Sequence, residues 1–191
     1  MKADQIALNM NQKQRPNRFG DEVWIFQKLL RKTEYFQNCR KDPLSKIYLH
    51  YLRYRLHRLS LTCGFTIPRN VFGPGLSIAH RGTIIIHPKV KVGENCRLNT
   101  CVIIGTSPTD NVDLVPKIGN NVFIGPGVVI TGDIEIADGI AIGANSYVDK
   151  SFLEREITIA GIPARKISQK GQRKVFGRAT DTLRQKNVLE H

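Results

Sequence analysis

The stretch KIGNNVFIGPGVVITGDIEIADGIAIGANSYV, residues 117–148, places an aliphatic side chain at every sixth position. An earlier run with the same period begins at Ile86. The repeated residues are Ile86, Val92, Leu98 and Ile104 in the first run and Ile118, Ile124, Ile130, Ile136, Ile142 and Val148 in the second. A period of six fits neither the 3.6-residue turn of an α-helix nor the two-residue alternation of a flat strand. It is typical of a parallel β-helix, in which short strands alternate with tight corners.

Three such hexapeptides would form one triangular coil, with each repeated aliphatic side chain directed into the prism. Four positions after most of these residues a small or aliphatic residue recurs, which would fill a corner of the interior. These residues are Val90, Cys96, Val102, Val122, Val128, Ile134, Ile140 and Ser146. Hydrogen bonds between coils would run as in a parallel sheet, and several coils must stack because none buries its face alone. The alternative, independent strands of a β-sandwich, predicts simple alternation with irregular turns instead of a fixed period.

Two segments interrupt the period, and functional residues tend to lie where a regular scaffold is interrupted. The first is IAHRGT at 78–83, directly before the first run. The second is 106–116, where the repeated aliphatics are fourteen residues apart, two more than a pair of hexapeptides. This second segment carries Asp110 and Asp113, and its turn residues predict an external loop.

Two helices are predicted before the repeats. The first begins at Asp21 and runs to about Asn38. The second begins at Asp42-Pro43, with aspartate as N-cap and proline in the first helical position, and ends at Gly64. The second helix is basic and amphipathic, so it either lies on a membrane surface or, as is commoner, packs on its own protein or a partner subunit.

The chain is therefore expected to consist of one domain with appendages. The predicted segments are a loose polar arm (1–16), an N-terminal helical region (17–65), the β-helix domain (66–168), a basic tail (169–188) and a remnant of a vector-encoded tag (189–191). Within the tail a short helix is expected around residues 181–186.

Charge is concentrated at the two ends of this 191-residue chain, whose formal net charge is +13. Residues 1–70 carry +9 and residues 163–188 carry +7, whereas residues 71–162 carry −2. No nucleic-acid motif accompanies the charge, so nucleic acid is not expected as a partner. Attraction to phosphate-bearing cofactors, attraction to an anionic membrane or polymer, and simple solvation remain open explanations.

The sequence also bears on the compartment of the protein. No stretch approaches the roughly 20 apolar residues that span a bilayer, and the N-terminus is polar. The four cysteines show no metal-type spacing. We therefore expect reduced thiols and a cytoplasmic location.

Four motifs carry a resemblance to a known family. They are NVFGPGLSIAH at 70–80, VIIG at 102–105, IGNNVFIGPG at 118–127 and AGIPAR at 160–165. Together they resemble the hexapeptide-repeat acyltransferases, specifically the serine acetyltransferase-like branch and within it the O-acetyltransferases of capsule and exopolysaccharide synthesis. The resemblance covers about residues 44–168. It implies a left-handed β-helix, acetyl transfer from acetyl-CoA to a hydroxyl, no metal, and a homotrimer with active sites between subunits.

The resemblance assigns His80 as the general base. An alcohol attacks a thioester readily only when a base removes its proton, and a histidine suits that task near neutral pH. A backbone N–H near Gly105 would stabilise the oxyanion. His80 could otherwise be a corner histidine that is satisfied by a backbone carbonyl. His87 is the second candidate, as a residue that lines the cleft for the acceptor or is merely exposed.

The cofactor site is also implied by the resemblance, along a groove between two β-helices. The matching small residues are Gly125, Pro126, Gly143 and Ala144, and the matching cations at the nucleotide end are Arg165 and Lys166. Small residues permit close approach of the pantetheine, and cations suit phosphates. A solvated cation is the alternative for Lys166.

Three positions depart from the pattern of true serine acetyltransferases. Ala79 stands where the family places aspartate before the histidine, Val115 where it places histidine, and Thr66 near the acidic residue that orients the histidine. These departures disfavour serine as the acceptor and favour a saccharide hydroxyl by elimination. Asp110 and Asp113 are candidates for binding the acceptor, and either of them or a carboxylate of a neighbouring subunit is an option for orienting His80.

Three other functions are alternatives. Serine acetyltransferase itself is the first alternative. A zinc carbonic anhydrase on the same β-helix requires three converging histidines, and the repeat region offers only His80 and His87. A non-catalytic scaffold associated peripherally with a membrane through its basic ends is the third.

Overall fold

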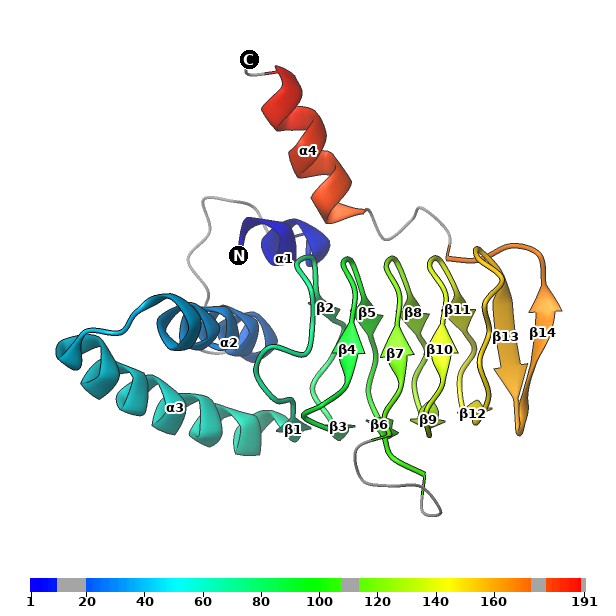
Figure 1. Ribbon diagram of the computed structural model, residues 1–191, viewed down its shortest axis with the longest axis horizontal. Helices are drawn as coiled ribbons and strands as arrows, with labels where there is room; N and C mark the ends of the chain where they lie inside the picture. The colour runs from blue at the N-terminus through cyan, green and yellow to red at the C-terminus, as the bar shows by residue number, and fades with distance from the viewer. Residues whose placement is uncertain (10–19, 108–113, 173–177, 190–191) are drawn as a thin grey trace.

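The computed structural model describes residues 1–9, 20–107, 114–172 and 178–189. Its main body is a prism of short parallel strands, with a helical hairpin at one end (Figure 1). The parallel β-helix predicted from the period of six is therefore confirmed, as are the N-terminal helices.

The prism has three faces, which we call A, B and C. Face A contains β1 (Phe65–Thr66), β3 (Ile84–Ile86), β6 (Val102–Gly105), β9 (Val129–Thr131) and β12 (Tyr147–Val148). Face B contains β4 (Lys91–Val92), β7 (Lys117–Ile118) and β10 (Glu135–Ile136). Face C contains β2 (Ser77–Ile78), β5 (Arg97–Leu98), β8 (Phe123–Ile124), β11 (Ala141–Ile142), β13 (Thr158–Gly161) and β14 (Ala164–Ser168). All pairs are parallel except β13 with β14, which is antiparallel.

The strand register shows how the second interruption fits the coils. Ile124 pairs with Ile142, eighteen positions further on, which is one coil of three hexapeptides. Leu98 pairs with Ile124 across 26 positions. The coil that contains the interruption therefore has eight extra residues. The fourteen-residue step from Ile104 to Ile118 is one hexapeptide with an insertion of eight, not two hexapeptides with an insertion of two.

The repeated aliphatic residues form the core of the prism. All ten are at most 5% exposed, and the eight small or aliphatic residues predicted to fill the corners are at most 7% exposed. Coil stacking thus places these side chains in one continuous column, as the pattern predicts. Burial of apolar surface in this column stabilises the fold by roughly 25 cal/mol for each Å² removed from water.

Asparagine shapes the corner between faces B and C. Asn95 and Asn121 have left-handed backbone angles (φ 56° and 57°), and the side-chain amide of Asn95 donates to Asn121 Oδ1 at 2.9 Å. Asparagine tolerates this region better than most residues. These two asparagines therefore supply the left-handed backbone turn at this corner.

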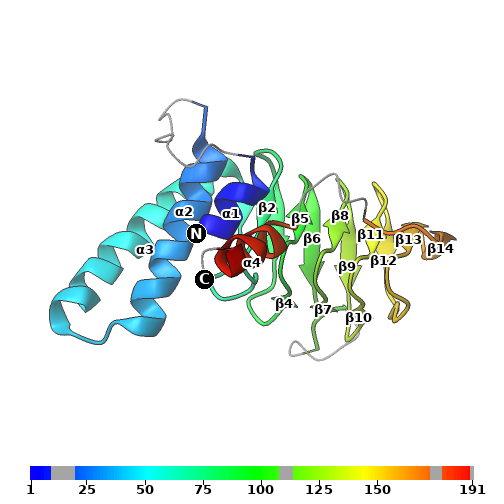
Figure 2. The same ribbon diagram turned by 90° about the horizontal axis from the view of Figure 1, so that it is seen from above.

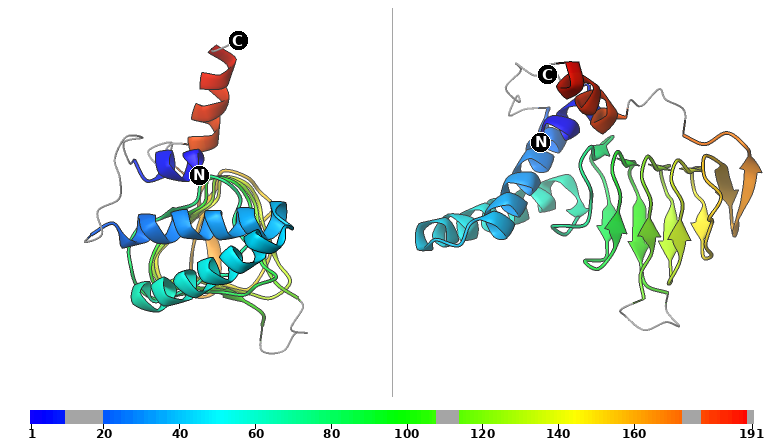
Figure 3. Two further views of the ribbon diagram at one scale, coloured as in Figure 1. Left: turned by 90° about the vertical axis from the view of Figure 1, so that its left-hand side faces the viewer. Right: turned by 45° about the horizontal axis from the view of Figure 1, so that its top comes forward.

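The two predicted helices are present as α2 (Glu22–Cys39) and α3 (Pro43–Cys63). Asp42 accepts a hydrogen bond from Ser45 N–H at 2.9 Å, and Gly64 ends α3 in the left-handed region. The helices form a hairpin that lies across the end of the prism (Figure 3, left).

The expected loose arm at the N-terminus is in part a helix, α1 (Lys2–Ala7). Asp4 of this helix is fully buried and accepts from the backbone N–H groups of Gly75 (2.7 Å) and Leu76 (3.1 Å). It also pairs with Arg31 at 2.6 Å. Ordering of residues 2–7 follows from these bonds, because the first coil has no preceding coil to satisfy its backbone. Residues 10–16 of the expected arm lie outside the described part of the chain.

Helix α2 supplies the other partners of that first edge. The Gln27 side chain donates to Leu76 O at 2.7 Å and accepts from Ile78 N–H at 3.1 Å. Arg31 donates to Phe72 O at 2.8 Å and to Gly73 O at 2.5 Å. These side chains act on the first coil as a further strand would.

The C-terminal segment returns to the same end of the molecule. Helix α4 (Ala179–Leu189) lies beside α1 (Figure 2), and it includes the short helix expected in the tail. Thr180 exchanges hydrogen bonds of 2.7 Å and 3.1 Å with Asn95, and Arg184 pairs with Glu94 at 3.0 Å. Among the helices that the structure describes, none is long and apolar enough to cross a membrane.

Replacing Asp4 tests the role of this cap. Asp4→Ala removes one of the two carboxylates paired with Arg31, Glu34 being the other, and leaves two buried backbone N–H groups unsatisfied, so we expect a loss of about 3–5 kcal/mol. In a chain of this size the loss corresponds to roughly 6–20 °C in Tm, measurable by circular dichroism. The matched variant Asp149→Ala, at an exposed position, should melt like the parent. Equal melting of both variants would show that Asp4 does not stabilise the fold.

Candidate active site

His80 lies on the edge of the prism where the chain passes from face C to face A, which we call the C–A edge. It follows Ile78 by two positions, and Ile78 is in register with Leu98, Ile124 and Ile142. The residues two positions after these are Thr100, Pro126 and Ala144. The structure therefore places His80 on the same edge as two residues predicted to bind the cofactor.

His80 is exposed and borders a hollow of about 300 Å³. The hollow is also lined by Asp21 and Glu22 at the start of α2, and by Trp24 and Arg81. Arg81 pairs with Glu22 at 3.5 Å. The pKa of Glu22 is lowered, chiefly by a hydrogen bond from its own backbone N–H and further by Gly20 N–H and the Arg81 charge. The hollow thus combines an ionised carboxylate with a guanidinium.

Asp21 and Glu22 are not among the carboxylates that the sequence indicates for orienting His80. Two that it does indicate, Asp110 and Asp113, lie outside the described residues. The sequence predicts Asp21 only as the start of a helix, and the 58 positions between it and His80 leave no local pattern. A folded structure was needed to place these acidic side chains beside the histidine.

Gly105 and His87 lie at the edge between faces A and B. A Cβ atom built on Gly105 would lie 3.8 Å from His87 Cβ. His87 is half-buried, and its Nδ1 accepts a hydrogen bond from Lys89 N–H at 3.3 Å. The other ring nitrogen is thereby left as the one that carries a proton in the neutral imidazole.

The predicted catalytic pair is not brought together within one chain. Thr100, which stacks over Gly82 in the same turn as His80, is five residues before Gly105, so face A separates the two edges by roughly 16 Å at about 3.3 Å per residue. Groups that act on one carbonyl must lie within about 3 Å of it. His80 and Gly105 can therefore act together only if the C–A edge of one chain faces the A–B edge of another.

Two of the predicted cofactor residues have a structural reason to be glycine. A Cβ on Gly125 would lie 2.7 Å from Ile142 O, and a Cβ on Gly143 would lie 2.8 Å from Ala160 Cβ. The stacking of coils alone requires these glycines. Pro126 and Ala144, in contrast, are exposed on the outside of the C–A edge.

The two predicted cations lie on β14 and differ in their contacts. Lys166 pairs with Glu154 at 2.6 Å, so a nearby carboxylate already balances its charge. Arg165 is exposed, in register with Ala160 of β13. Of the two, Arg165 is therefore the better placed to meet an anion from solvent.

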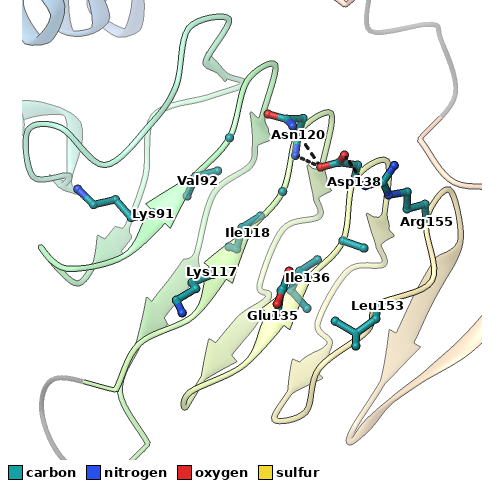
Figure 4. Close-up of a pocket in the computed structure, with 13 residues that line it drawn as sticks. Lys91, Val92, Lys117, Ile118, Asn120, Glu135, Ile136, Asp138, Leu153 and Arg155 are labelled. Atoms are coloured by element: carbon teal, nitrogen blue, oxygen red, sulfur yellow. Dashed lines mark hydrogen bonds and ion pairs between the residues drawn. The ribbon is translucent and has the colours of Figure 1, made fainter.

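A larger hollow, of about 560 Å³, lies on face B and holds no histidine. Lys91, Lys117, Glu135 and Asp138 are among its lining residues (Figure 4). Asp138 accepts from Asn120 N–H at 2.7 Å, which fixes the corner between two coils. Face B is opposite the C–A edge in a triangular prism, so this hollow is separate from the surroundings of His80. Within the described residues, no group of three or more His, Cys, Asp or Glu side chains is placed to hold a metal ion.

This architecture is that of a hexapeptide-repeat protein with a left-handed parallel β-helix. Residues 116–150 match the family model described as bacterial transferase hexapeptide (six repeats).

Among individual proteins, the chain is similar to bacterial serine acetyltransferases. It is 29% identical to that of Buchnera aphidicola over 164 residues, covering 84% of this chain and 57% of the relative. It is 31% identical to that of Synechococcus elongatus over 118 residues, covering 61% of this chain and 48% of the relative. The chain thus spans about half the length of the curated relatives that it matches.

Solved structures give the same result. The serine acetyltransferase of Brucella abortus superposes with a TM-score of 0.63 at 26% identity, covering 90% of this chain and 68% of that one. A structure of the Brucella protein in complex with coenzyme A gives a TM-score of 0.65 at 26% identity, covering 90% and 67%.

Alanine substitutions distinguish a glycine that is required by the packing of coils from one that has room for a side chain. Gly125→Ala places a methyl group against Ile142 O, so we expect a loss of about 1–3 kcal/mol. Gly105→Ala has ordinary van der Waals room and should melt within about 0.5 kcal/mol of the parent. Thermal melts of both variants provide the measurement. The interpretation of Gly125 fails if the two variants are equally stable.

Proposed function

We propose that this chain is an acetyl-CoA-dependent O-acetyltransferase in which His80 is the general base. The observation that carries the proposal is the position of His80. It is exposed on the C–A edge of a hexapeptide β-helix, on the same edge as Pro126 and Ala144 and beside a hollow of about 300 Å³. Similarity to serine acetyltransferases, one of them solved with coenzyme A, supports the same reaction class.

In the proposed reaction acetyl-CoA supplies an activated thioester. His80 removes the proton of the acceptor hydroxyl as its oxygen forms a bond to the acetyl carbon. The backbone N–H at Gly105 donates a hydrogen bond to the oxyanion. His80 then returns the proton to the departing sulfur as the C–S bond breaks. The products are the acetyl ester and free coenzyme A, and His80 is neutral again.

The proposed active form is a homotrimer with each site between two chains. The separation of His80 from Gly105 supports this assembly, because one chain supplies only half of each site. Face A, which lies between the two edges, exposes Ile85 and Ile103 (43% and 39%). Outward apolar side chains on a flat face favour contact with another copy.

For the acceptor, serine is the better supported of two candidates. The similar proteins are named serine acetyltransferases, and nothing in the comparisons favours a polysaccharide. Near His80, Glu22 and Asp21 suit an ammonium group, and Arg81 suits a carboxylate, which together match a zwitterionic amino acid. A sugar hydroxyl is the second candidate, favoured by alanine at position 79, where serine acetyltransferases have aspartate.

Replacing His80 tests the mechanism. His80→Gln should lower turnover by about 10²–10⁴-fold, because the base is lost while the exposed position tolerates the change. Release of the coenzyme A thiol measures the rate, and light scattering with a thermal melt checks assembly and folding. His50→Gln, an exposed histidine on α3, is the matched control and should retain full turnover. Unchanged turnover in His80→Gln would remove this residue from the mechanism.

Acceptor competition tests the substrate. With acetyl-CoA fixed, serine should support thiol release above the rate of hydrolysis, and common hexoses and amino sugars should not. Turnover with a sugar and none with serine would reverse the order of the two candidates. Glu22→Gln should weaken serine binding, because it removes a carboxylate proposed to bind the ammonium group of serine.

A further inference from the structure

Helix α3 carries a second apolar stripe that nothing in the chain covers among the described residues. The exposed side chains are Leu44 (79%), Ile47 (69%), Tyr51 (51%), Tyr54 (62%) and Leu61 (66%). Their positions follow alternating steps of three and four, with Arg58 completing the pattern, so they lie along one face of the helix. We call this face the outer stripe.

The outer stripe is not the margin of the face that packs on α2. The buried residues of α3 include Leu49, Leu52, Leu56 and Cys63. At 3.6 residues per turn, the centres of the two stripes are roughly 160° apart. Helix α3 is therefore apolar on two opposite sides, and only one side is used within the chain.

Positive charge surrounds the outer stripe. Residues 43–63 contain Lys46, Arg53, Arg55 and Arg58 and no aspartate or glutamate. A hollow of about 350 Å³ on one side of the stripe is lined by Arg55 and Arg58 together with Tyr54. A second hollow, of about 370 Å³, on the other side is lined by Arg53 and Arg69 together with Leu61.

In the second hollow, two arginine side chains have N–H groups without a hydrogen-bond partner among the described residues. The Nε atoms of Arg53 and Arg69 are buried and have no hydrogen-bond partner among the described residues. The pKa of Arg69 is lowered, first by burial and then by the positive charge of Arg53. Arg53 also donates through Nη2 to Gln37 Oε1 at 3.3 Å, a neutral partner, so the two adjacent guanidinium groups leave a local positive charge that suits a phosphate.

We propose that α3 docks on an anionic phospholipid bilayer, with the outer stripe in the boundary between headgroups and acyl chains and the flanking arginines on lipid phosphates. Leucine, isoleucine and tyrosine between cations are the composition of helices that lie in the membrane interface. Each Lys or Arg near an anionic surface contributes about 1 kcal/mol. The hairpin of α2 and α3 projects beyond the first coil, away from β14 (Figure 1).

A second copy of the chain fits this surface less well. Two α3 helices packed through their outer stripes would bring eight cations together without one acidic side chain from either helix. Like charges at close range destabilise such a contact. A bilayer that contains anionic lipid supplies the missing negative charge.

Vesicle flotation tests the proposal with the whole protein. We expect binding to phosphatidylcholine vesicles that contain about one third phosphatidylglycerol, and at least tenfold weaker binding to pure phosphatidylcholine. Binding should weaken as salt is raised, because salt screens the surface charge. No binding to either vesicle, or equal binding to both, overturns the proposal.

Two sets of variants assign the contact to α3. Leu44→Gln, Ile47→Gln and Leu61→Gln together should reduce binding at least tenfold. The control combines Leu153→Gln, Ile162→Gln and Ile167→Gln, which are similarly exposed (67%, 77% and 64%) and lie after the ten repeats, and should bind like the parent.

The second set of variants removes the two arginine charges of the second hollow. Arg53→Gln with Arg69→Gln should weaken binding about 25-fold, since each lost charge is worth about fivefold. Lys150→Gln with Arg155→Gln is the control, at exposed positions elsewhere, and should change binding little. Full binding by either α3 set contradicts the proposal. If the stripe variant instead dissociates the assembly in light scattering, the outer stripe is a contact between copies and the proposal is wrong.

Discussion

Hydrogen bonding between successive coils is the constraint on which the rest of this structure depends. Each coil satisfies its backbone through the coils above and below it, so the first coil has an open edge. Here side chains close that edge. Asp4, Gln27 and Arg31 bond to the backbone between Phe72 and Ile78. The helices α1 and α2 are therefore part of the β-helix in energetic terms, although their sequence carries no repeat. At the other end β14 turns back antiparallel on β13 and ends the stack.

Periodicity made the body of the prism predictable. Each short strand directs one side chain inward, so an aliphatic residue recurs at every sixth position. All ten of these residues are buried. The caps of α3 were also predictable, because Asp42 and Gly64 act within a few residues of their own positions. The helix α1 was not predictable. Asp4 contacts backbone more than 70 positions away, and a contact of that kind imposes no pattern on the residues near it.

The candidate site was predictable only as a set of positions along the chain. His80 shares the C–A edge with Pro126 and Ala144, because strand pairing keeps Ile78, Leu98, Ile124 and Ile142 in register although the coils differ in length. The strand register also puts Gly105 on another edge, which the motif resemblance does not reveal. A glycine in the sequence also does not distinguish a cofactor site from close packing between coils. Gly125 is required by the neighbouring coil whether or not a cofactor passes there.

At the capped end of the prism, the hydrogen bonds that close the first coil and the acidic residues beside His80 belong to the same helix, α2. Helix α2 bonds to the first coil through Gln27, and this contact holds the start of the same helix, with Asp21 and Glu22, beside His80. A substitution that loosens the cap should therefore alter the hollow at His80 as well as the stability of the fold. The proposed acceptor site is consequently a property of the helical region and the first coil jointly. Coil stacking alone sets the positions of Pro126 and Ala144 on the C–A edge. The proposed cofactor contacts therefore depend on the repeats, whereas the proposed acceptor contacts also depend on the helices that close the end of the prism.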